Sequence, residues 1–128
     1  MKEGRIAVPS IEAGGLDGQR SGHFGHCDVF TLVDVKGGVI KQVTTILNQS
    51  HVQGGCMVPV NLLAEHKVDA LIVGGIGMRP LAGFRQVGIV VYYDVTRQEI
   101  KPVVEDLLAG ILPTIEDNQV CGGGGVGG

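Results

Sequence analysis

The chain contains 128 residues, which is the size of one ordinary domain and too short for two. Apolar residues make up 44% and charged residues only 18%, so the chain can bury a core and is not disordered through excess charge. The 10 Lys and Arg residues against 13 Asp and Glu give a net charge of −3, and no basic run occurs. A nucleic-acid-binding surface is therefore not expected.

Cysteine usage and the first residues suggest a cellular compartment. Three cysteines, an odd number, and an N-terminus without an apolar signal segment predict reduced thiols in a cytoplasmic protein. No uninterrupted apolar stretch is long enough to span a membrane. The 22 glycines are about 17% of the 128 residues, against an average usage of about 7%. This excess indicates loops that bend sharply or bring bare backbone close to a ligand.

The first half of the chain alternates short strands with polar loops. Residues 5–8 are predicted to form a strand that ends at Pro9, before a glycine-rich loop that runs to Cys27. Residues 29–35 and 39–47 are predicted to form a hairpin around Lys36-Gly37-Gly38. A second polar loop follows over residues 48–55.

The second half has the alternation of helices and buried strands that is typical of parallel sheets. Helices are expected over residues 56–66, 78–86 and from about Glu99 to Gly110, and apolar strands over residues 69–73 and 88–93. We expect one domain over residues 1–112 and a flexible, glycine-rich tail over residues 113–128.

This order of elements predicts an α/β fold with a five-stranded mixed sheet, one antiparallel strand and flanking helices, in a ribonuclease-H-like topology. The C-terminal ends of the first, third, fourth and fifth strands would share one edge, where open α/β sheets bind their ligands. Three loops would meet at this edge, namely residues 9–27, 47–56 and 74–80.

Soft or borderline metal donors are concentrated in these loops. Imidazole, thiolate and thioether groups suit copper, iron–sulfur species or zinc better than calcium or magnesium. The candidate metal ligands are His23, His26, Cys27, His51, Cys56 and, from the tail, Cys121.

These residues also have purely structural interpretations. His23 could bind a loop carbonyl, Cys56 could be a buried helix thiol, and Met78 could belong to the core. His26 and Cys27 are adjacent, so they do not have zinc-finger spacing.

The segment Gly74-Gly75-Ile76-Gly77 precedes a predicted helix. Pro80 stands where a dinucleotide fingerprint requires a third glycine, so nucleotide binding is not expected. Backbone N–H groups at the helix start could still hold an anion, with Arg79 adding positive charge. No hydrolase motif occurs, and the nearby carboxylates Glu12, Asp17 and Asp28 do not form an evident catalytic set, so we expect no catalytic residues.

Motifs in all three loops resemble a known family. Ser21-x-His23-Phe24-Gly25 with Phe30, Gly54-Gly55 after His51, and the run from Val68 to Gly77 are similar to the dinitrogenase iron–molybdenum cofactor biosynthesis family. Its members include NifX-type carriers, the C-terminal domain of NifB-type proteins and the molybdenum–copper "orange protein". The resemblance spans roughly residues 5–112 and implies a carrier of metal–sulfur clusters rather than an enzyme.

The hypothesis is a small carrier of an anionic metal–sulfur cluster that contains molybdenum with copper or iron. Backbone amides would approach the sulfides, and Arg20 or Arg79 would offset the charge. Partners would be a cofactor-assembly or client protein, and the chain would be a monomer or weak dimer. The alternatives are a metal-free regulatory or scaffold module that uses the same edge, and a hydrolase. The candidate cofactor-binding residues are Arg20, Ser21, Gly22, Phe24, Gly25, Gly54, Gly55, Gly74, Gly75, Gly77, Met78 and Arg79.

Overall fold

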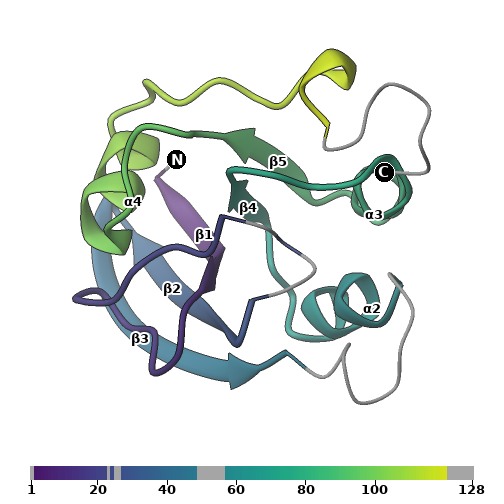
Figure 1. The fold of residues 1–128 in the computed structure, drawn as a ribbon. Helices are drawn as coiled ribbons and strands as arrows, with labels where there is room; N and C mark the ends of the chain where they lie inside the picture. Colours follow the sequence, from purple (N-terminus) through teal and green to yellow (C-terminus); the bar gives the residue numbers. More distant parts are fainter. Residues whose placement is uncertain (1, 23, 25–26, 49–56, 121–128) are drawn as a thin grey trace.

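One mixed sheet organises the chain (Figure 1). The computed structural model describes residues 2–22, 24, 27–48 and 57–120, and in this part of the chain it has five strands in the order β3-β2-β1-β4-β5. Only β2 runs against the other four, which confirms the predicted mixed α/β sheet. The strands are β1 (Glu3–Ser10), β2 (Val29–Lys36), β3 (Val39–Leu47), β4 (Ala70–Val73) and β5 (Val90–Tyr93).

Helices cover both faces of the sheet, as Figure 1 shows. Helices α2 (Val58–Glu65) and α3 (Met78–Gln86) lie on one face, and α4 (Ile100–Leu108) lies on the other. A short 3-10 helix, η2 (Asp117–Gln119), follows. None of the described helices has the length and apolarity that crossing a membrane requires.

Alternation along the strands divides the core into two layers. Ala7 and Leu71 pack with Leu63 of α2 and Phe84 of α3, whereas their strand neighbours Ile6 and Ile72 pack on the side of α4. Because successive strand residues point to opposite faces, a strand that is apolar throughout supplies both layers at once. The four residues of β4 are all buried for this reason.

Strand β1 continues through Pro9, which differs from the prediction that Pro9 ends it. Pro9 pairs with Phe30 in the antiparallel ladder between β1 and β2. Its carbonyl accepts a hydrogen bond from the Ser21 N–H at 2.8 Å, so this backbone edge faces the loop rather than β2. The missing proline N–H therefore removes no ladder hydrogen bond.

Residues 113–120 pack on the domain, which corrects their assignment to a flexible tail. Tyr93 N–H donates to the Pro113 carbonyl and Ile115 N–H donates to the Val91 carbonyl, both at 2.9 Å. The Ile115 side chain is buried, and Arg85 of α3 pairs with Asp117 at 2.8 Å. Apolar burial and these bonds fix the segment against β5. Residues 121–128 lie outside the described residues.

The loop after β1 also packs on the sheet, and two adjacent glycines in this loop provide a matched test of its contact with β2. Gly14 and Gly15 both have positive φ, but a Cβ on Gly14 would lie 2.8 Å from Thr31 Oγ1, whereas a Cβ on Gly15 would meet nothing within 4 Å. Gly15→Ala should lower the free energy of unfolding by about 1–2 kcal/mol through backbone strain. Gly14→Ala should lower it by about 1–3 kcal/mol more through overpacking against β2. Urea unfolding measures both, and equal losses would show that the loop does not pack as described.

Candidate functional site

Strands β1 and β4 are neighbours whose continuations leave in opposite directions. After β1 the chain returns toward β2, and after β4 it proceeds through α3 to β5. This divergence is the topological switch point of the sheet, and it creates a crevice beyond the C-terminal strand ends. This crevice is therefore the candidate site.

Hydrogen bonds bring the loops at this edge together. The Phe24 N–H donates to the Gly75 carbonyl at 2.9 Å, joining the β1–β2 loop to the segment after β4. The Asn48 amide donates to the Cys27 carbonyl at 2.9 Å, joining the end of β3 to the same loop. The Arg20 N–H donates to the Gln98 carbonyl at 2.6 Å. The first and third predicted loops therefore meet, and the β5–α4 loop joins them, whereas only Leu47 and Asn48 of the second loop belong to the described residues.

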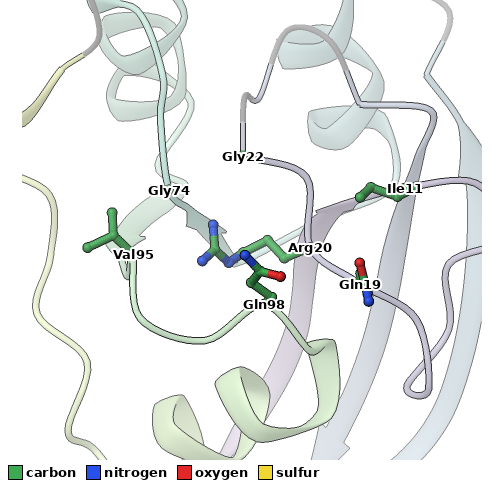
Figure 2. A pocket seen from close by; sticks show the side chains of 7 residues that line it. All are labelled: Ile11, Gln19, Arg20, Gly22, Gly74, Val95 and Gln98. Atoms are coloured by element: carbon green, nitrogen blue, oxygen red, sulfur yellow. The ribbon is translucent and has the colours of Figure 1, made fainter.

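A pocket of about 360 Å³ opens between these loops (Figure 2). Arg20, Gly22 and Gly74 are predicted site residues that line it, whereas the other four lining residues are not among the predicted site residues. For two of these four residues the sequence did hold a signal, because Val95 and Gln98 follow β5, whose C-terminal end lies at the same edge. The missed residues are Ile11, Gln19, Val95 and Gln98.

Arg20 is a buried cation that lines the pocket. Its side chain is 5% exposed, and its Nε and Nη2 donate to the Arg97 carbonyl at 3.1 and 2.6 Å. Burial lowers the pKa of the guanidinium, and the nearby Asp94 carboxylate partly offsets this effect. The distance from Nη2 to Asp94 Oδ2 is 3.6 Å. Figure 2 shows the guanidinium between Gly74 and Gln98.

Asp94 fixes the turn that holds Arg20. Its Oδ1 accepts from Thr96 Oγ1 and its Oδ2 accepts from the Arg97 N–H, both at 2.9 Å. These two bonds orient the Arg97 carbonyl toward Arg20. Gly74 lacks a side chain where Arg20 passes, and a Cβ there would collide with Nη1. One reason for glycine at position 74 is therefore the close approach of a charged side chain.

The segment after β4 presents backbone and an exposed arginine. Gly75 is buried, and Gly77 is the N-cap of α3 with an extended backbone. Met78 and Arg79 in the first turn are exposed, and among the described residues no carboxylate pairs with Arg79. The first N–H groups of a helix have no intrahelical acceptor, so they can bind an anion.

Two predicted site residues place their side chains in the core. Phe24 is 2% exposed, and its ring centroid lies 5.7 Å from that of Phe30 and 5.2 Å from that of Phe84. Cys27 is 1% exposed, and burial raises the pKa of its thiol to about 12 although Asn48 donates to Sγ at 3.3 Å. Each residue offers the edge its backbone rather than its side chain. Ser21 is also buried, with its N–H bonded to the Pro9 carbonyl.

Several predicted site residues lie outside the described residues. They are His23, Gly25, His26, His51, Gly54, Gly55, Cys56 and Cys121. Over residues 2–22, 24, 27–48 and 57–120, no three His, Cys, Asp or Glu side chains gather as a metal site would require.

A mixed five-stranded sheet with helices on both faces places the chain in the α/β class. The model of the dinitrogenase iron–molybdenum cofactor family matches residues 5–110. Because the match spans most of the chain, the chain belongs to this family, as the resemblance predicted.

Known proteins resemble this chain in sequence or in fold. An uncharacterized protein of Methanocaldococcus jannaschii is 35% identical over 91 residues, which are 69% of this chain and 72% of the relative. The apo orange protein of Desulfovibrio gigas superposes with a TM-score of 0.77 at 25% identity, over 88% of this chain and 93% of that one. A putative NifB protein from Thermotoga, at 23% identity, superposes with a TM-score of 0.69 over 87% and 92%. This last likeness concerns the fold alone.

The environment of Cys27 predicts an unreactive thiol. Because only a thiolate attacks alkylating reagents, a pKa of about 12 leaves the group protonated at pH values near 8. In a chain with Cys56→Ser and Cys121→Ser, Cys27 should resist iodoacetamide in the native state and react once denaturant is added. Mass spectrometry measures the labelling. Native labelling as fast as that of the unfolded chain would show that the thiol is not buried.

Proposed function

We propose that this chain is a non-catalytic carrier that binds an anionic metal–sulfur cluster at the C-terminal edge of its sheet and passes it to another protein. The observation that carries the proposal is the attachment of the β1–β2 loop to the glycine segment after β4, through the 2.9 Å bond between Phe24 and Gly75 at the switch point. Family membership and the apo orange protein support the cluster as cargo.

The cargo would be held mainly by charge and backbone rather than by many covalent ligands. Helix α3 starts shortly after the C-terminal end of β4, and its first N–H groups and the exposed Arg79 in its first turn both favour an anion. Weak attachment suits a carrier, because release is part of its task. The net charge of −3 opposes an anion, so local features must supply the attraction.

Side-chain metal ligands belong to this proposal as expectations. His23, His26, His51 and Cys56 would supply replaceable donors, with Cys121 from the C-terminal end. The burial and raised pKa of Cys27 argue against a ligand role for that residue. We propose molybdenum with copper or iron as the metals, since the donors are soft or borderline.

The remaining parts of the proposal concern context. The sheet order β3-β2-β1-β4-β5 with only β2 reversed supports a ribonuclease-H-like classification. We propose a cytoplasmic carrier, monomeric or weakly dimeric, whose partner is a cofactor-assembly or client protein. The client need not be nitrogenase.

Reversing the charge of Arg79 tests the electrostatic part of this proposal. Arg79→Glu should weaken binding of a cluster assembled from tetrathiomolybdate and copper by about tenfold, the usual order for loss of a charge-assisted contact. Zinc binding should not fall. The measurement is anaerobic titration followed by absorption spectroscopy and elemental analysis.

Lys67→Glu is the matched control, because Lys67 is exposed and precedes β4 at the opposite edge of the sheet. It makes the same change in net charge and should leave cluster affinity unchanged. Equal losses of cluster affinity in the two variants would show that only the net charge of the protein matters, and not the position of Arg79. Tight zinc binding without any cluster binding would contradict the carrier function and indicate a plain metal site. Absence of both zinc and cluster binding would favour a metal-free scaffold module.

A further inference from the structure

Arg20 carries a hydrogen-bonding group that the fold does not use. Its Nε and Nη2 are fixed on the Arg97 carbonyl, and Nη2 lies near Asp94. Nη1 carries two further N–H donors. The described residues place no acceptor on Nη1, although the side chain is 5% exposed. Leaving such donors buried without an acceptor is costly, so their position requires an explanation.

We infer that the pocket beside Arg20 is an anion-binding subsite in which Nη1 is the charged donor to a compact, weakly hydrated anion. Arg20 is one of the residues that line the pocket, and Figure 2 shows its guanidinium beside Gly74. The absence of a side chain at Gly74 leaves Nη1 uncovered, because a Cβ there would collide with it. An anion in the pocket would supply the acceptor that the described protein atoms do not.

The charges around the pocket permit an anion. No acidic side chain is among its lining residues. Asp94, the carboxylate nearest to Arg20, already accepts from Thr96 and from the Arg97 N–H. Its 3.6 Å distance to Nη2 leaves Nη1 free to serve a second negative group. Arg20 is thus held in place from one side and can bind from the other.

The lining also indicates which anions fit. Ile11 and Val95 contribute aliphatic surface, and Gln19 and Gln98 contribute the only side-chain amides among the lining residues. A strongly hydrated oxoanion would lose more hydrogen bonds to water than these few donors replace. An anion that bears sulfides is more weakly hydrated, so it loses fewer hydrogen bonds to water on entering the pocket. It also gains contact with the aliphatic side chains. The preferred ligand is therefore a thiometallate, and this choice of ligand rests on the proposed function.

Titration with three anions tests the selectivity. Tetrathiomolybdate, molybdate and inorganic phosphate are titrated separately by calorimetry without oxygen and without copper. Tetrathiomolybdate should bind at least about tenfold more tightly than either oxoanion, the order expected for one charge-assisted bond that is not lost to hydration. Equal affinities, or tighter phosphate binding, would overturn the thiometallate preference.

Variants at Val95 test the location without removing Arg20. Val95 is 59% exposed, so Val95→Asp and Val95→Lys should fold normally. The acidic variant should weaken tetrathiomolybdate binding several-fold, and the basic variant should strengthen it. Ile111 is 66% exposed and does not line the pocket, so Ile111→Asp and Ile111→Lys are matched controls that should change nothing. Identical effects at both positions would exclude the pocket.

Gly74→Ala is an independent test, because the added methyl group would collide with Nη1 and displace it from the pocket. It should abolish tetrathiomolybdate binding, and circular dichroism reports whether the fold survives.

If the copper–thiomolybdate cluster still binds the wild type and depends on Arg79, while the Val95 variants have no effect, the subsite is wrong and the carrier function stands. If tetrathiomolybdate binds and depends on Val95 but no cluster is taken up, the subsite stands and the carrier function is wrong.

Discussion

The candidate edge depends on how the charge of Arg20 is satisfied. The side chain starts in the loop after β1, and its acceptor is the carbonyl of Arg97 in the loop after β5, 77 positions away. A guanidinium that is 5% exposed cannot give up this acceptor without leaving buried N–H donors unsatisfied, which is unfavourable even though Asp94 supplies the opposite charge. The bond therefore keeps two distant loops together across the ends of β1 and β4, and it forms the pocket before any ligand arrives.

Pre-formation of this kind matters for a protein that holds its cargo weakly. If the loops had to be ordered on binding, the entropy of ordering would consume much of the attraction that an anion can provide. Here Phe24 and Cys27 secure the β1–β2 loop by packing into the core, and Asp94 secures the β5–α4 loop through Thr96 and Arg97. The core residues near the edge thus serve the site by holding its backbone in position.

Much of the fold could be predicted because hydrophobic patterning is local. The apolar run of β4 and the bounds of α3, Met78–Gln86, follow from the sequence alone. Side-chain destinations at the edge could not be predicted in the same way. Phe24 and Cys27 stand in a glycine-rich polar loop without periodicity, so nothing local shows that both enter the core. The roles of Val95 and Gln98 depend on contacts with Arg20, which only the tertiary structure reveals.

The central claim is that an anionic metal–sulfur cluster binds at the C-terminal edge of the sheet. Amide-resolved NMR of the chain, before and after addition of a diamagnetic copper–thiomolybdate cluster, tests it most directly. We expect shifts concentrated at Gly22, at residues 74–79 and at residues 95–98, with little change at the opposite edge, around the Gly37-Gly38 turn and Lys67. Shifts centred on that opposite edge, or no shifts at saturating cluster, would contradict cluster binding at the C-terminal edge.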